Sequence, residues 1–171
     1  MLRVGILSDT HGYIDPRILD TVNSCEHIIH AGDICGASIL EQLKPEIALH
    51  AVAGNNDHPA AWPVDEHEVV SALPKQINLE LPGGLVIIEH GHRLGNSPDH
   101  DQFRWDHAEA RMIVYGHTHK RVTDQSAEPW VVNPGAAGSV RTKGGPSCLI
   151  LHASESAWEI ETIVFADEAI A

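Results

Sequence analysis

The sequence predicts a layered α/β domain whose sheet is partly parallel. In the first half of the chain, short apolar runs alternate with segments that have the apolar spacing of a helix. In the second half, apolar runs follow one another and are joined by Gly-rich turns. Alternating strands and helices are typical of parallel sheets, whereas tight turns join antiparallel strands. The chain has 171 residues, 43% of them hydrophobic, which suits one domain over residues 1–171 with a substantial core.

Strand and helix signals alternate in the first half. A buried strand is predicted over residues 2–7. Asp15 and Pro16 follow, and they suit the N-cap and the first position of a helix. Ile18, Leu19 and Val22 give that helix its apolar face. The remaining elements here are strands over residues 27–30 and 47–52 and a helix marked by Ile39, Leu40 and Leu43, which ends before Pro45.

A hairpin is predicted in the second half. Residues 77–81 alternate between apolar and polar side chains, and a Gly-rich turn leads from them into a strand over residues 85–89. Residues 56–74, just before this hairpin, hold prolines and mixed charges, which predicts an irregular segment that includes a turn of helix. The further predicted elements are a helix over residues 97–112 and strands over residues 113–115, 130–132, 148–152 and 158–165.

Charge and cysteine content bear on the partners and on the cellular compartment of the protein. The net charge is −13, from 24 acidic and 11 basic side chains, which makes a stable nucleic-acid or anionic-membrane partner unfavourable. The three cysteines have no paired spacing, as in proteins of reducing compartments. Neither a secretion signal nor an apolar stretch of membrane-spanning length is evident. We therefore expect a cytoplasmic protein.

Metal-binding types of side chain follow five of the apolar runs. Because the carboxyl ends of parallel strands meet at one edge of a sheet, we expect these side chains to converge. Their mixture of carboxylate, carboxamide and imidazole suits Mn²⁺, Fe²⁺, Ni²⁺ or Zn²⁺ better than Ca²⁺. The pattern predicts two adjacent divalent cations, an arrangement that hydrolyses phosphoesters. The five stretches are Asp9-Thr10-His11, Gly32-Asp33, Gly54-Asn55-Asn56-Asp57, His90-Gly91-His92 and Gly116-His117-Thr118-His119.

The charge balance of such a centre favours an anionic substrate. Two neighbouring cations repel each other unless an anion lies between them, and Asp33 is the natural bridging carboxylate. Two cations bring four positive charges, of which Asp9 and Asp33 offset two and a bridging hydroxide one more. A surplus of about one positive charge attracts a phosphoryl group even to an acidic protein.

The five stretches, in this order, resemble those of the calcineurin-like metallophosphoesterase superfamily. Within it, the chain is similar to small single-domain bacterial and archaeal phosphodiesterases, which are related in fold to a retromer subunit of eukaryotic cells. The resemblance implies a four-layer α/β/β/α sandwich with two mixed β-sheets. It also implies a hydrolase that cleaves small phosphodiesters through a dinuclear metal centre and a bridging hydroxide, with two Mn²⁺ ions as the first choice and Ni²⁺, Fe²⁺ or Zn²⁺ as alternatives.

The resemblance also implies roles for individual residues. Many relatives carry His directly after the motif Asn55, where this chain has Asn56. His92 and His58 are therefore the alternative proton donors to the leaving group. We take Asp33, Asn55 and His92 as the catalytic residues. The Asn133-Pro134-Gly135 turn matches a further feature near the site. One ion is expected on Asp9, His11, Asp33 and His119, and the other on Asp33, Asn55, His90 and His117.

Several alternatives remain open from the sequence. A non-catalytic metal-binding scaffold of the same fold is the rival to an enzyme, although the complete ligand set favours the enzyme. A DNA nuclease fits poorly, because the chain is small and acidic and lacks the His after Asn55. Asp57 either orients the metal site or caps a loop, and Arg141 is either a phosphate ligand or a surface charge. Exposed late strands favour a homodimer.

Overall fold

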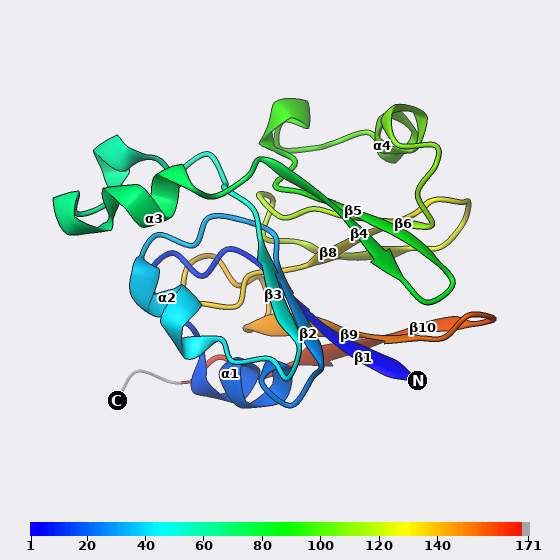
Figure 1. Ribbon diagram of the computed structural model, residues 1–171, viewed down its shortest axis with the longest axis horizontal. Helices are drawn as coiled ribbons and strands as arrows, with labels where there is room; N and C mark the ends of the chain where they lie inside the picture. Colours follow the sequence, from blue (N-terminus) through cyan, green and yellow to red (C-terminus); the bar gives the residue numbers. More distant parts are fainter. Residues whose placement is uncertain (169–171) are drawn as a thin grey trace.

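Two five-stranded sheets pack face to face in the computed structural model, which describes residues 1–168 (Figure 1). The first sheet has the strand order β10-β9-β1-β2-β3 and the second the order β4-β5-β6-β8-β7. Strands β1, β2 and β3 are parallel in the first sheet, as are β5, β6 and β8 in the second, and the flanking pairs are antiparallel. The strands are β1 (Leu2–Leu7), β2 (His27–His30), β3 (Ala48–Ala51), β4 (Gln76–Leu81), β5 (Gly84–Glu89), β6 (Met112–Val114), β7 (Arg121–Asp124), β8 (Trp130–Pro134), β9 (Ser147–Ala153) and β10 (Trp158–Val164).

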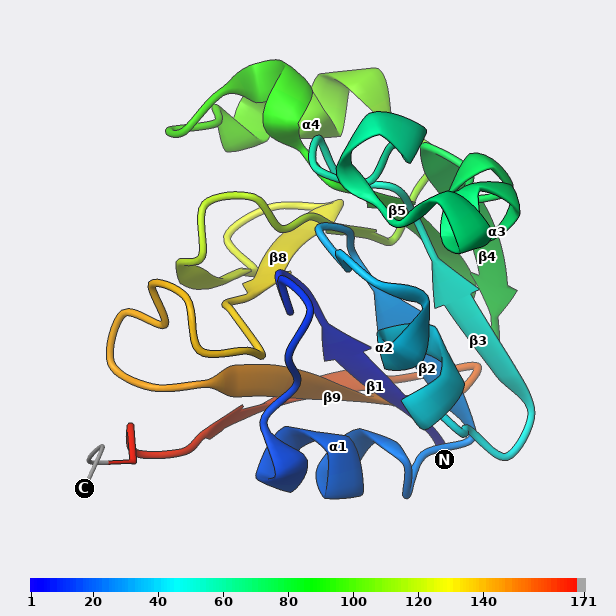
Figure 2. The same cartoon turned by 90° about the vertical axis from the view of Figure 1, so that its left-hand side faces the viewer.

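Helices cover the outer faces of the two sheets (Figures 1 and 2). Helices α1 and α2 lie against the first sheet and α4 against the second. The four-layer α/β/β/α sandwich implied by the resemblance is thus confirmed. The helical segments are α1 (Pro16–Val22), α2 (Ala37–Gln42), α3 (His67–Ser71), α4 (His100–Asp106) and the 3-10 turns η1 (Pro59–Ala61), η2 (Val64–Glu66) and η3 (His92–Leu94).

Three hydrophobic clusters fill the spaces between the four layers. Because successive side chains of a strand point to opposite faces, Ile6 of β1 joins the cluster between the sheets while Leu7 joins the cluster under α1 and α2. On the far side, Phe103 of α4 packs on Ile87 and Ile113. This packing on both faces of each sheet fixes the strand ends, from which the loops of the candidate site emerge.

Four details of the elements predicted after residue 55 need correction. The helix predicted over residues 97–112 is confined to α4, because the chain turns at His107, whose ring lies 2.9 Å from the Glu89 carboxylate. Met112 then opens strand β6, one residue before the predicted range. The segment over residues 56–74 contains η1, η2 and α3 rather than a single helical turn, and the hairpin strand β7 is absent from the prediction.

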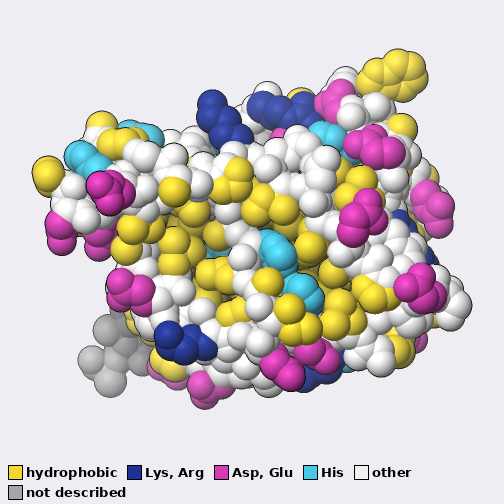
Figure 3. Space-filling view, in the orientation of Figure 1, with side chains coloured by type: hydrophobic (Ala, Val, Ile, Leu, Met, Phe, Trp, Pro, Cys, Tyr) yellow, Lys and Arg dark blue, Asp and Glu magenta, His cyan; other side chains and the backbone are white. Residues whose placement is uncertain are grey.

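The surface matches the acidic composition. The face in Figure 3 carries scattered acidic side chains around a hydrophobic middle and no broad basic patch. Among residues 1–168, none of the helices has the length and hydrophobicity that crossing a bilayer requires. The last three residues of the predicted domain lie outside the described part of the chain.

Candidate metal centre

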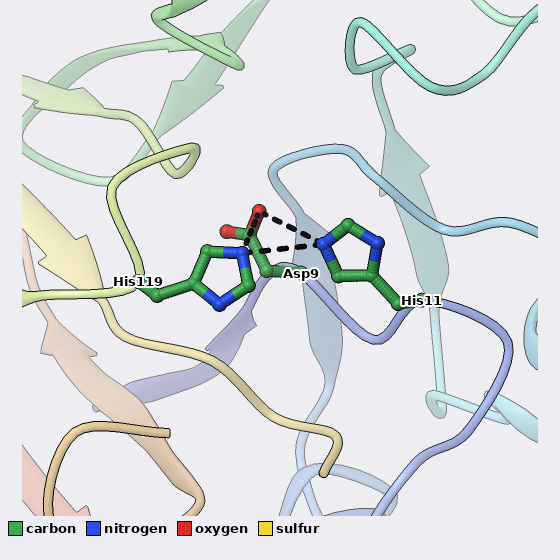
Figure 4. A group of neighbouring side chains, drawn as sticks. All are labelled: Asp9, His11 and His119. Carbon is green, nitrogen blue, oxygen red and sulfur yellow. Dashed lines mark hydrogen bonds and ion pairs between the residues drawn. The ribbon is translucent and has the colours of Figure 1, made fainter. Parts of the chain in front are cut away.

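The loops after β1, β2, β3, β5 and β6 converge at one end of the two sheets, and they carry all seven predicted ligands. Asp9, His11 and His119 form the tightest group (Figure 4). The Nε2 atom of His119 lies 3.3 Å from Oδ1 of Asp9, and that of His11 lies 3.8 Å from the same oxygen. The two Nε2 atoms are 3.2 Å apart. Three lone-pair donors that face one point are the arrangement a cation requires.

A second group adjoins the first. Nε2 of His90 lies 3.4 Å from Oδ2 of Asp33 and 4.0 Å from Oδ1 of Asp9. Oδ2 of Asp33 is also 3.6 Å from Nε2 of His11. Both carboxylates therefore reach both groups, whereas the sequence argument gave the shared position to Asp33 alone. Asp9, His11 and Asp33 follow strands of the first sheet, and His90 and His119 follow strands of the second.

Asn55 and His117 lie beside this second group. Oδ1 of Asn55 is 3.1 Å from Nδ1 of His117. The His117 ring centroid is 5.3 Å from that of His90. His117 stands outside the two tightest groups formed within residues 1–168, at the more open side of the centre. The structure thus brings all seven predicted ligands into one neighbourhood, with five in close contact and two at the edge.

Hydrogen bonds orient two of the imidazoles. Nδ1 of His90 is 2.7 Å from the carbonyl oxygen of Ala31, and Nδ1 of His119 is 2.8 Å from that of Val140. A carbonyl oxygen only accepts, so each Nδ1 carries the proton and donates it. In the neutral ring the Nε2 lone pair is then directed at the carboxylates, as in metal-binding histidines.

Asp9 is held in a similar way. Its Oδ2 accepts hydrogen bonds from the Ser8 hydroxyl at 2.6 Å and from the backbone N–H of His117 at 3.1 Å. Its Oδ1 has no hydrogen-bond partner within the described chain, and neither has Nε2 of His90, although both atoms are buried. A buried polar atom without a partner is rare, because it loses its bonds to water. Two such atoms, both able to donate lone pairs, fit a bound cation.

Backbone strain is concentrated at the same residues. A positive φ is uncommon for residues other than glycine and is stabilised by the surrounding structure at functional sites. Five of the predicted ligands adopt it, with φ between 48° and 66°. They are Asp9, His11, Asp33, His117 and His119.

Close approach of the loops also requires glycine at two positions. A Cβ at Gly116 would overlap the Ser8 hydroxyl and lie 2.7 Å from Oδ2 of Asp9. A Cβ at Gly32 would lie 2.6 Å from Nδ1 of His90. Any side chain here would displace a predicted ligand, which explains why glycine precedes both Asp33 and the pair of histidines after β6.

Asp57 connects two of the loops. It is buried, and its carboxylate accepts hydrogen bonds from the backbone N–H groups of Ile34, Cys35 and Gly54 and from Nε1 of Trp62. The two proposed roles of Asp57 therefore coincide, since it caps the Asp33 loop and ties that loop to the one that carries Asn55. Trp62 is itself buried.

Asn56 contacts the centre directly, which the sequence argument missed. Its backbone N–H donates to Oδ1 of Asp33 at 3.0 Å, and its side-chain amide donates to Oδ2 at 2.9 Å. The residue in the place of the family histidine is thus a neutral donor to Asp33. Of the two alternative proton donors, His92 has its ring centroid 5.5 Å from that of His90, whereas His58 is exposed ahead of η1.

Two further residues support the loops around the centre. The Asn133 side-chain amide donates to the carbonyl oxygen of Gly116 at 2.8 Å, so the Asn-Pro-Gly turn does lie near the site. His30 is buried and accepts at Nδ1 from the backbone N–H of Gly32 at 3.2 Å. Its position after an apolar run was the only sequence signal for this role.

Electrostatics within the centre favour an ionised Asp33. Burial opposes ionisation of Asp33, but the neighbouring imidazole of His90 and the hydrogen bonds from Asn56 outweigh it and hold the pKa of Asp33 well below its usual value. Burial also opposes protonation of His90, yet Asp33 and Asp9 outweigh it and raise its pKa. For His92, burial and the neighbouring His90 lower the pKa. A metal ion and a proton would compete for the same nitrogen of His90.

Comparison with known proteins agrees with this geometry. The family model of the calcineurin-like phosphoesterase superfamily domain matches residues 2–156. A phosphodiesterase of Methanocaldococcus jannaschii is 27% identical over 150 residues, which cover 78% of this chain and 83% of the relative. A probable metallophosphoesterase of Methanothermobacter thermautotrophicus is 26% identical over 167 residues, covering 94% and 91%.

Solved structures share the fold over nearly the whole chain. A Vps29 single mutant from Entamoeba histolytica superposes with a TM-score of 0.75 at 19% identity and covers 96% of this chain and 99% of its own. A structure described as a novel archaeal phosphodiesterase gives a TM-score of 0.69 at 23% identity, with coverage of 95% and 100%. Given the family match and the architecture, the chain belongs to the calcineurin-like phosphoesterase superfamily.

Proposed function

We propose that the chain is a metal-dependent phosphodiesterase that cleaves small phosphodiesters with two divalent ions, Mn²⁺ being the first choice. The observation that carries the proposal is the pair of buried atoms without partners, Oδ1 of Asp9 and Nε2 of His90, within two adjoining groups of ligands. Family membership and the phosphodiesterase name of the Methanocaldococcus jannaschii relative support the reaction class.

In this proposal each ion has its own set of residues. Asp9, His11 and His119 hold one, and His90, Asn55 and His117 hold the other, while Asp33 contacts both. Such ions, when bound, polarise phosphoryl oxygens and lower the pKa of water. The carbonyl groups of Ala31 and Val140 keep two of the imidazoles turned toward the centre, and Asp57 fixes the distance between two of the loops.

His92 is the proposed proton donor to the leaving alcohol. Its ring lies beside those of His90 and His117, with centroid distances of 5.5 and 6.2 Å, so it borders the open side of the centre. A neutral leaving alcohol departs more readily than an alkoxide, and a positioned imidazole can supply the proton. Nitrophenolate needs no such help, because it is already a stable anion.

Release of nitrophenol from bis(4-nitrophenyl) phosphate tests the proposal. We expect a rate that depends on added Mn²⁺, that is abolished by EDTA, and that falls to background in Asp33→Ala. An alkyl phosphodiester should be hydrolysed more slowly by His92→Gln than by the matched variant His58→Gln. Absence of any metal-dependent rate in the unmodified protein would refute the proposal.

A non-catalytic scaffold is the second candidate, because Vps29 structures superpose on the whole chain. One of these neighbours, also from Entamoeba histolytica, is described as a complex with zinc. For this chain, metal binding by titration calorimetry without turnover of any phosphodiester would favour the scaffold. The homodimer expected from the sequence remains a proposal, which the molar mass from sedimentation equilibrium would test.

A further inference from the structure

A groove of about 540 Å³ adjoins the candidate metal centre on the side of His11. Tyr13 and Arg141 line it, and the same Arg141 extends to the centre, where its Nη2 atom lies 3.4 Å from Nε2 of His119. Its lining residues come from the turn after β1, the loop between β8 and β9 and the segment after β10. Figure 2 shows the backbone of these three segments. Its volume suits an organic group of nucleoside size.

Contacts within the protein hold the walls of the groove in place. The backbone of Gly138 lies directly on the turn after β1, so that a Cβ there would overlap the carbonyl oxygen of Thr10 and lie 2.6 Å from that of Tyr13. Two hydrogen bonds hold the loop that contains Gly138. The N–H of Asp15 donates to the carbonyl oxygen of Ala137 at 3.0 Å, and Nδ1 of His119 donates to that of Val140. A preformed groove binds a ligand without the cost of ordering its walls.

Arg141 provides a cation at the inner end of the groove. Its backbone is held in the left-handed region, with φ of 50°, and its side chain is exposed. Within residues 1–168 its guanidinium forms no ion pair with a carboxylate. An unpaired guanidinium beside a metal centre can bind a phosphate through two parallel hydrogen bonds. It would hold the substrate phosphate at the inner end of the groove, beside the metal centre.

The outer part of the groove offers an aromatic face and hydrogen-bond acceptors. Tyr13 is 48% exposed although it is a large aromatic residue. Asp15 and Asp167 line the same space, and each already has one partner, Arg17 and the Thr142 hydroxyl respectively. Glu168 lines the groove as well, so three carboxylates make its outer part acidic, and Arg17 offsets part of this charge through ion pairs with Asp15 and Glu168. Carboxylates accept hydrogen bonds, so this part suits a neutral group with hydroxyl donors better than an anionic one.

From this arrangement we infer that the groove binds the nucleoside part of a nucleotidyl phosphodiester. The base stacks on Tyr13, sugar hydroxyls donate to the carboxylates of Asp15 and Asp167, and Arg141 holds the phosphate beside the metal centre. Base stacking on aromatic side chains tolerates many bases, so the inference names nucleosides as a class and no single base. It rests on the proposed function and specifies its substrate.

Two chromogenic esters separate this inference from the proposed function. In thymidine 5′-(4-nitrophenyl phosphate) and in bis(4-nitrophenyl) phosphate, water adds to phosphorus and the P–O bond to nitrophenol breaks. We expect the nucleoside ester to have a higher kcat/KM. Tyr13→Ala should lower kcat/KM for the nucleoside ester about tenfold more than for the bis-ester, as expected for a lost stacking contact. Val64→Ala, at an exposed apolar residue outside the groove, is the matched control and should alter neither value.

Binding gives a second readout. Thymidine 5′-monophosphate added to the Zn²⁺-loaded protein should shift the NMR amide signals of Tyr13 and of residues 138–142. Equal kcat/KM for the two esters, equal losses in Tyr13→Ala, or shifts confined to other parts of the chain would overturn the inference while leaving the proposed function intact. Failure to cleave either ester with added Mn²⁺ would overturn both.

Discussion

His30 should make folding stability depend on pH, because its surroundings accept only the neutral ring. The side chain is fully buried on β2. Nδ1 accepts from the backbone N–H of Gly32, so Nε2 carries the proton and donates to the Thr10 hydroxyl 3.0 Å away. That hydroxyl in turn donates to the carbonyl oxygen of Ile34. A second proton would have to sit on Nδ1, facing an N–H group.

The size of the effect follows from the two pKa values. Burial lowers the pKa of His30 from 6.5 to about 4 in the folded protein. Between these values the unfolded chain binds a proton that the folded chain does not, so stability falls as the pH is lowered from 6.5 toward 4. A shift of this size corresponds to roughly 3 kcal/mol of unfolding free energy.

Urea unfolding of the metal-free protein at pH 7 and pH 5, in the presence of EDTA, measures this contribution. His30→Gln cannot titrate at this position. This variant should be less stable than the unmodified protein at pH 7. Between pH 7 and pH 5, however, its unfolding free energy should fall by about 2 kcal/mol less than that of the unmodified protein. Equal losses in the two proteins would refute the argument from the hydrogen bonds around His30.

Three other substitutions test the support of the centre. Ser8→Ala removes a donor to Asp9 and should weaken Mn²⁺ binding about 10–100-fold in a chelator competition, whereas Ser154→Ala, at an exposed serine, should not. Asp57→Ala leaves four donors without an acceptor, three of them buried, and should cost more than about 3 kcal/mol of unfolding free energy in urea, so a smaller loss would contradict its central role. Gly116→Ala places a methyl group against Asp9 and should impair metal binding, and unchanged calorimetric affinity would show that the loop can move aside.

The ligands were predictable because they follow apolar runs. A buried strand can be recognised from a few residues, and side chains directly after parallel strands must lie at the same end of the sheet. This reasoning placed Asp9, Asp33 and His90 together from the sequence. It did not show that Asp9 as well as Asp33 lies close to both groups of ligands, because that depends on differences of a few tenths of an ångström between interatomic distances.

The errors arose where contacts distant in sequence decide the local structure. Residues 107–112 have reasonable helix-forming side chains, but the bond between His107 and Glu89 and the pairing of Met112 with β5 and β8 end the helix early. Strand β7 is short, polar and stabilised by β8 alone. The roles of Asn56 and His30 depend on hydrogen-bond direction, for which a sequence holds no pattern.

The origin of the ligands in both sheets has a mechanical consequence. The space between the sheets is filled mainly by an apolar cluster, which resists separation more than sliding. Ions bound by Asp9 and Asp33 on one side and by His90 and His119 on the other would cross-link the two halves at one end. Metal would then raise the unfolding temperature by binding only the folded chain. It would also suppress shear between the sheets, so that the metal-free protein should exchange its amide hydrogens faster at that end.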